Sequence, residues 1–393
     1  MTPYLSLASI VGLGAMTLAM ALAVKVRGKI GPAWTLVAMV LGIWFQYRQL
    51  APVGGGRFLP AWVLLVLTGA YEYALLQWAM RTKGRRRAWW IIPLGLAPLF
   101  LARCAPWVLG DVQWGFIGLP FVMLRFLDVL WSVTDGALKR VGLRDYLVYV
   151  FFFPTVLAGP VDRFRRFTPD WKRTRDAKEF WRDLDIGVGY LFRGFLYKYV
   201  LAILFNEWLT HCLATRHDLV GEVEYAYVYT LGFFFDFAGY SSLAMGVSRF
   251  FGVQTPDNFC QPFAAVDIRD FWGRWHISLS KWFRDHIFTR FLVMAKRRKW
   301  VRRRGSAMTL GYMVTFGLMG LWHGFAPWFL LYGLYHGALM AGHAVLLPAR
   351  GAPQPMSWGR AWLGRILVFH FCCLGMWIFS GHGFMVSGSG GDF

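Results

Sequence analysis

The chain has 393 residues, of which 57% are hydrophobic, 18% are aromatic and only 16% are charged. This composition excludes an ordinary soluble protein, as well as the disordered, collagen-like and disulfide-scaffold classes. The 42 Lys and Arg residues outnumber the 21 Asp and Glu residues, which gives a net charge of +21. Because the basic clusters border apolar runs, they favour cytoplasmic anchoring of a membrane protein over nucleic-acid binding.

Apolar runs follow one another along the chain, and each is long enough to cross a hydrocarbon core of about 30 Å. They predict about ten or eleven transmembrane helices in an all-α polytopic membrane protein, and the runs with Pro or Gly are also open to broken or re-entrant forms. The runs lie near residues 5–24, 31–47, 58–80, 88–103, 113–132, 145–160, 185–210, 223–252, 307–322, 327–347 and 361–380.

Short basic segments between the apolar runs predict the cytoplasmic side of the membrane. They are Lys25 to Lys29, Arg81 to Arg87, Arg163 to Arg175 and Lys296 to Arg304, and they place the N-terminus outside. The stretch 160–184 mixes Arg with aromatic residues, which fits an interfacial segment on an anionic leaflet or a plain basic surface loop. The five cysteines show no metal-binding or disulfide spacing and are expected to be packing residues.

A single carboxylate, Asp236, lies within a strongly aromatic run. An ionisable residue inside a membrane segment is a functional hypothesis by default, and a proton relay or an anchor for a site are both open. We favour a structural ion pair with a buried arginine, because a charge in a low-dielectric setting requires a partner.

The stretch 258–290 is dense in charged and aromatic side chains, which cannot face lipid. Read as one helix over 271–285, it places His276, Ser280 and Phe283 on one face. Arg284 beside Asp285 offers an internal ion pair, which such a helix needs if those charges are partly buried. An amphipathic helix at the membrane interface explains the same pattern as well as a functional site does.

A second histidine, His323, lies at the junction of two apolar runs, with Gly324 after it and Pro327 shortly beyond. We expect a broken backbone there and an imidazole that faces a cavity. Imidazole suits acid/base chemistry near neutral pH, although a hydrogen-bonded packing role is equally open. His336 is a weaker candidate of the same kind.

The chain shows no phosphate-binding loop, serine-hydrolase elbow or zinc-binding spacing, so these chemistries have no positive support. Acyl transfer from an activated thioester needs fewer catalytic groups. A base for the acceptor hydroxyl, a route for the acyl group and exclusion of water are sufficient.

Two histidine motifs, Trp275 to Asp285 and Trp322 to Gly324, resemble those of the membrane-bound O-acyltransferase (MBOAT) family in order and spacing. The likeness is strong over about 145–345. Within the family it is greater to the D-alanyl-transferring branch, through Phe151 to Phe167, Asp236 to Ser241, Asn258 to Asp285 and Met319 to Gly324. The alginate-acetylase branch is similar too, but it usually has a Pro-Leu-Gly-Gly segment where this chain runs Phe291 to Trp300.

The resemblance implies a single membrane domain with a ring of helices around a central funnel or tunnel. It implies N-terminal helices in 1–140, a catalytic core in 145–345, and a C-terminal helix with a flexible tail in 346–393. The donor would be D-alanine as a phosphopantetheine thioester on a small acidic carrier protein at the cytoplasmic face. The acceptor would be a hydroxyl of a cell-envelope polymer, such as teichoic acid, with a small membrane peptide and an extracytoplasmic transferase as further partners.

By the same resemblance, His323 matches the principal catalytic histidine and His276 the second one, with no metal and no nucleic acid involved. The residues expected to bind substrate or support the site are Trp275, Ser278, Trp282, Arg284, Asp285, Asp236 and Trp322. The residues expected to dock the carrier are Arg297, Arg298, Lys299, Arg302 and Arg303. An exopolysaccharide O-acetyltransferase remains an alternative, as does a transporter with a His323 and Asp236 proton relay. The expected location is the cytoplasmic membrane.

Overall fold

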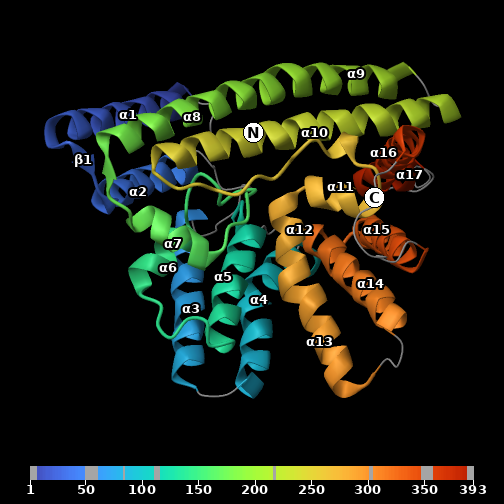
Figure 1. Ribbon diagram of the computed structural model, residues 1–393, viewed down its shortest axis with the longest axis horizontal. Helices are drawn as coiled ribbons and strands as arrows, with labels where there is room; N and C mark the ends of the chain where they lie inside the picture. The colour runs from blue at the N-terminus through green and yellow to red at the C-terminus, as the bar shows by residue number, and fades with distance from the viewer. Residues whose placement is uncertain are drawn as a thin grey trace. The chain divides into compact units, whose positions relative to one another are not determined.

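The computed structural model describes residues 7–48, 61–82, 85–109, 116–215, 218–300, 304–346 and 357–386, and they are helical almost throughout (Figure 1). Their elements are α1 (Leu7–Arg27), β1 (Lys29–Ile30), α2 (Pro32–Arg48), α3 (Ala61–Arg81), α4 (Arg85–Leu109), α5 (Leu119–Thr134), α6 (Leu143–Val150), α7 (Phe164–Lys172), β2 (Arg175–Asp176), α8 (Ala177–Phe195), the π-helix η1 (Leu196–Leu201), α9 (Ala202–Thr215), α10 (Leu219–Phe250), the 3-10 helix η2 (Pro262–Ala264), α11 (Ile268–Arg274), α12 (Ile277–Phe283), the π-helix η3 (Arg284–Phe288), α13 (Thr289–Arg298), α14 (Arg304–His323), α15 (Pro327–Leu346), α16 (Trp358–Ser380) and α17 (His382–Val386).

All but one of the predicted apolar runs contain a long helix, which confirms the all-α class of the membrane protein. Four stretches within the described residues are helical, long and apolar enough to cross a membrane by length and composition: Val63–Arg81, Ala177–Thr215, Pro327–Leu346 and Trp358–Ser380. Their windows are only 17–33% buried inside the protein, so most of their apolar surface is left for lipid.

The predicted run at 145–160 is wrong as a transmembrane helix. Helix α6 ends at Val150, and the next residues form turns that are nevertheless buried. Pro154 and Pro160 each lack the N–H that a continuing helix requires. The apolar composition of this stretch therefore reflects burial inside the protein rather than contact with lipid.

A buried turn segment must satisfy its backbone polar groups from its neighbours. Arg125 of α5 provides this, since its guanidinium donates to the carbonyls of Tyr149 (2.9 Å) and Val150 (3.0 Å) and to Oγ1 of Thr155 (2.5 Å). Asp128, one turn later on α5, accepts from the backbone N–H of Phe164 at 2.9 Å and so caps the start of α7.

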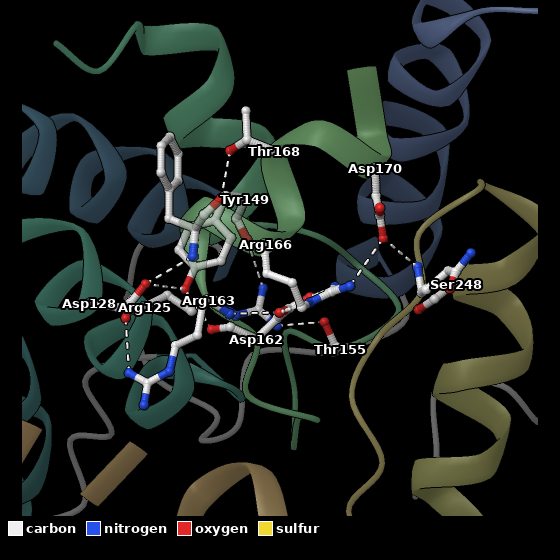
Figure 2. Close-up of polar contacts among 12 residues, drawn as sticks. Arg125, Asp128, Tyr149, Thr155, Asp162, Arg163, Arg166, Thr168, Asp170 and Ser248 are labelled. Atoms are coloured by element: carbon white, nitrogen blue, oxygen red, sulfur yellow. Dashed lines mark hydrogen bonds and ion pairs between the residues drawn. The ribbon is translucent and has the colours of Figure 1, made fainter. Parts of the chain in front are cut away.

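Further charges extend this network along the segment (Figure 2). Arg163 donates to Asp128 at 2.9 Å, and Arg166 forms an ion pair with Asp162 and contacts Asp170 at 3.1 Å. Burial raises the pKa of Asp162, while the hydrogen bonds and charge of Arg166 oppose that rise. The charges fix the course of the chain through residues 151–163, so α5 determines the shape of this motif.

The chain forms two compact units, residues Met1–Phe192 with Ser241–Pro256, and Arg193–Tyr240 with Asp257–Phe393. In the first unit α3, α4 and α5 contact one another, and β1 pairs antiparallel with β2. The second unit contains both histidine motifs. Its helices α14 and α15 pack with their backbones in close approach: a Cβ at Gly333 would lie 2.2 Å from the carbonyl oxygen of Phe316. Glycine is therefore required there for α15 to reach α14.

Candidate functional site

The segment around His276 is two short helices rather than one. Helix α11 ends at Arg274 and α12 begins at Ile277, so the expectation of a continuous helix over 271–285 is wrong. His276 between them adopts a left-handed conformation with φ 41° and ψ 50°. Such a conformation is uncommon for a residue other than glycine and persists only where its surroundings enforce it.

Hydrogen bonds between Asn258 and the two residues after His276 enforce this conformation. Its carbonyl accepts from the N–H of Ile277 at 2.9 Å, and its Oδ1 accepts from Oγ of Ser278 at 2.5 Å. Just beyond, the N–H of Cys260 donates to the carbonyl of Arg274 at 3.0 Å. The segment 258–260 thus holds both sides of the break and fixes the direction in which the imidazole of His276 points.

His276 is only 5% exposed and lies against aromatic rings. Its ring centroid is 4.7 Å from that of Phe237, edge to face, and 6.4 Å from that of Phe259. Its Nδ1 is buried and has no hydrogen-bond partner among the described residues. Burial, with a smaller contribution from the nearby His323, lowers the pKa of His276 to about 3, so this imidazole remains neutral and can donate or accept hydrogen bonds rather than carry charge.

His323 is the last residue of α14, and α15 begins at Pro327, so the expected break in the backbone at this histidine is confirmed. Its side chain is less buried than that of His276. The ring centroid lies 4.9 Å from Trp322, 5.1 Å from Phe379 and 6.4 Å from Tyr332. Residues from α14, α15 and α16 thus surround this imidazole.

The two histidines share one aromatic environment. Phe233 of α10 contacts Trp275, next to His276, with centroids 6.4 Å apart, and Phe379, next to His323, at 5.7 Å. The structure therefore brings the two histidine motifs to one place, although 47 residues separate His276 from His323 in the sequence.

Asp236 forms an ion pair with Lys198, which confirms the structural interpretation of this carboxylate with a lysine in place of the expected arginine. The Lys198 side chain is 7% exposed, whereas that of Asp236 is 53% exposed. Lys198 lies in the π-helix η1, and a Cβ at Gly239 would lie 2.7 Å from the backbone nitrogen of Lys198. The widened turn brings the lysine to α10, and π-helical turns are frequent at functional sites.

The remaining expected supporting residues lie in three places. Trp275, Ser278 and Trp322 lie in or next to the histidine environment. Arg284 and Asp285 form the expected ion pair at 2.9 Å, with side chains that are 60% and 46% exposed. Trp282 is buried and packs against Phe283 and His286, at centroid distances of 5.2 and 5.0 Å.

Sequence reasoning missed several residues that surround the histidines. Phe237, Phe259, Tyr332 and Phe379 contribute rings to this environment, and Lys198 pairs with Asp236. Phe237 and Phe259 lie in stretches that carry the family resemblance but were given no role, and Lys198, Tyr332 and Phe379 lie in none of those stretches. Only their proximity to His276 and His323 distinguishes them.

The expected carrier-docking residues Arg297, Arg298 and Lys299 are exposed at the C-terminal end of α13. Lys299 ends the helix in a left-handed conformation, and the Arg298 guanidinium lies 5.2 Å from the centroid of the Trp300 ring. Arg302 and Arg303 lie outside the described residues. An exposed basic helix end with an adjoining tryptophan is suited to an acidic protein surface.

Comparisons with known proteins agree with this geometry. The model of the MBOAT, membrane-bound O-acyltransferase family matches residues 10–388. The chain is 36% identical over 301 residues to a teichoic acid D-alanyltransferase of Bacillus subtilis (strain 168), covering 74% of this chain and 76% of that protein. It is 32% identical over 355 residues to a teichoic acid D-alanyltransferase of Streptococcus thermophilus, covering 81% and 85%.

A probable alginate O-acetylase of Pseudomonas fluorescens is 32% identical over 229 residues, which cover 57% of this chain and 44% of that protein. The family match spans the chain nearly from end to end and includes both histidines. This match decides in favour of acyl transfer over transport, and the protein belongs to the MBOAT family of membrane-bound O-acyltransferases.

Proposed function

We propose that this protein moves D-alanine from a thioester, through an acceptor hydroxyl, toward a cell-envelope polymer, teichoic acid or an analogue of it. The observation that carries the proposal is the extent of the similarity. Relatives named teichoic acid D-alanyltransferase match 74% and 81% of the chain, whereas the alginate O-acetylase relative matches 57%. The acceptor polymer and the acyl group follow from those relatives.

His323 is the general base in this proposal. It takes the proton from the acceptor hydroxyl as the oxygen attacks the thioester carbonyl; the C–S bond then breaks, and the thiolate takes up a proton to leave as a thiol. The partial exposure of His323 leaves it within reach of a substrate. His276, buried and neutral, orients the thioester end by hydrogen bonding, and the aromatic rings around both histidines exclude water.

The donor is D-alanyl-phosphopantetheine on a small acidic carrier protein that docks at the cytoplasmic face of the inner membrane. The basic segment 296–304 supports this, since its described arginines are exposed, complement an acidic surface and follow the preference of basic residues for the cytoplasm. In the basic segment 160–175, by contrast, Arg163, Arg166 and Arg175 are paired with carboxylates within the protein. A small membrane peptide and an extracytoplasmic transferase relay the acyl group onward to the polymer.

The test compares envelope fractions of the wild-type strain, a strain in which the gene is deleted, and the deletion strain with the wild-type gene restored. Ester-linked groups are released with mild base and identified by mass spectrometry. We expect D-alanine to disappear on deletion and to return on restoration. Loss of acetate instead would assign the protein to polysaccharide acetylation, and an unchanged ester content would contradict transfer to the envelope.

The basic end of α13 yields a prediction about the carrier. Replacing Arg297 and Arg298 together with Glu is expected to raise the KM for the loaded carrier by about tenfold, equivalent to about 1.4 kcal/mol, with kcat unchanged. The difference should shrink at high salt, because exposed charges are screened. The measurement is acyl transfer from a purified loaded carrier at several salt concentrations.

The matched control for this double variant is Lys139→Glu with Arg140→Glu, the same change of charge at two adjacent exposed residues outside both basic segments. Its KM for the carrier should equal that of the wild type. An equal rise in KM for the control, or no rise for the double variant at low salt, would show that α13 does not dock the carrier.

A further inference from the structure

His336, a histidine with no place in the proposed transfer step, lies in a cage of aromatic rings in the second unit. It is 1% exposed and lies on α15, one helical turn after Tyr332. Its ring centroid is 4.7 Å from Tyr332, 5.1 Å from Trp272 at an interplanar angle of 90°, and 5.1 Å from Tyr335. Such burial is unusual for a polar ring without a structural or catalytic reason.

Two buried nitrogen atoms in this cage lack hydrogen-bond partners among the described residues. They are Nδ1 of His336 and Nε1 of Trp272. An indole N–H can only donate, whereas the imidazole has both a donor and an acceptor nitrogen in its neutral form. A water molecule can accept a hydrogen bond from the indole N–H of Trp272 and donate one to Nδ1 of His336. Buried water typically joins polar groups that would otherwise be unsatisfied.

Tyr332 connects the cage to the proposed site. Tyr332 contacts His336 on one side and His323 on the other, with centroids 6.4 Å apart in the second case. Phe379 contacts both Tyr332 and His323, at 5.1 Å each. A shift of His336 therefore displaces Tyr332, and with it the packing surface of His323.

The backbone of α16 holds His336 against this surface. A Cβ at Gly375 would lie 2.5 Å from Nε2 of His336 and 3.3 Å from the Tyr335 ring, so the glycine allows the helix to pack directly on the imidazole. The close contact with α16 and the aromatic rings of the cage together hold the imidazole in one orientation. A fully satisfied polar group in such surroundings rigidifies what it contacts.

We propose that His336 and Trp272 hold one water molecule between them, and that this group positions Tyr332 and thereby the imidazole of His323 for acyl transfer. His336 is thus a positioning residue, not a catalytic one. The inference rests on the proposed function of His323 as the base.

The test measures kcat, the KM for the loaded carrier and the thermal unfolding midpoint for purified full-length variants. For His336→Phe we expect kcat to fall by about tenfold to a hundredfold with KM unchanged, because small misplacements of a catalytic group carry large rate penalties. His336→Gln, which keeps a donor and an acceptor, should recover much of that loss. His370→Phe is the control, since His370 is exposed on α16 and its Nδ1 lies 2.7 Å from the carbonyl oxygen of Ile366 on the same helix.

A double-mutant cycle tests the shared water. Trp272→Phe removes the second partner, so the double variant with His336→Phe should be no slower than the slower single variant. Effects on kcat that multiply instead would show that the two side chains act separately, and would overturn the shared water. A wild-type kcat in His336→Phe would overturn the positioning role. The same conclusion would follow if His336→Phe and His336→Gln lost as much kcat as each other and as much of the unfolding midpoint as each other.

Failure of this inference can be separated from failure of the proposed function. Activity retained in a His323→Ala variant would contradict the proposed base. Activity lost in that variant but fully kept in His336→Phe would leave the base in place and overturn the inference alone.

Discussion

We expect the His323→Ala variant to lose acyl transfer by a factor of about 10² to 10⁴, which is the usual contribution of a general base. The protein should still insert and accumulate. His323 is only partly buried and ends α14, so its truncation leaves neither a large cavity nor an unpaired buried charge.

The measurement has two readouts, ester-linked groups in the envelope and transfer by the purified variant from a loaded carrier. Immunodetection in membrane fractions checks accumulation. His211→Ala is the matched control, because His211 is exposed on α9 and plays no part in the site. Transfer at the wild-type rate by His323→Ala would remove this residue from the mechanism.

The second large effect concerns stability rather than catalysis. Asp183 of α8 is completely buried and lies among three arginines: Arg175 at 3.2 Å, and Arg173 and Arg249 at 3.5 Å. Arg175, itself 4% exposed, also donates to the carbonyl of Phe250 at the end of α10. Asp183 therefore neutralises a cluster that ties several segments of the first unit together.

Replacing Asp183 with Asn is expected to lower the free energy of unfolding by about 3–5 kcal/mol, because the buried Arg175 loses its compensating charge. We expect a lower thermal unfolding midpoint and reduced accumulation, with the ratio of activity to folded protein preserved. Asp185→Asn on the same helix is the control, since Asp185 is exposed. Equal midpoints for the two variants would show that the cluster contributes little to stability.

The sequence predicted the membrane character, most of the helices and the break at His323. It also identified Asp236 as an ion-pair partner. Each of these depends on local properties, namely the apolar content of a run, a Pro or Gly near its end, and the cost of an isolated charge in it. The same local reasoning failed at 145–160, where an apolar run is buried by protein rather than by lipid.

The prediction of one continuous helix over 271–285 was wrong for a related reason. Its sequence has helical spacing, but Asn258, 18 residues before His276, holds the chain in a break through Ile277 and Ser278. No periodicity within the segment carries that information.

The sequence by itself thus determined the membrane character, most of the helices and which histidine motifs to examine, because partitioning is a sum over neighbouring residues. The tertiary structure alone decided that Phe233, Phe379 and Tyr332 enclose the two histidines. It also decided that His336 and Trp272 bury nitrogen atoms without partners among the described residues. These contacts join helices far apart in the chain. They depend on how closely the helices pack, as at Gly333 and Gly375, and close packing is a property of the assembled fold.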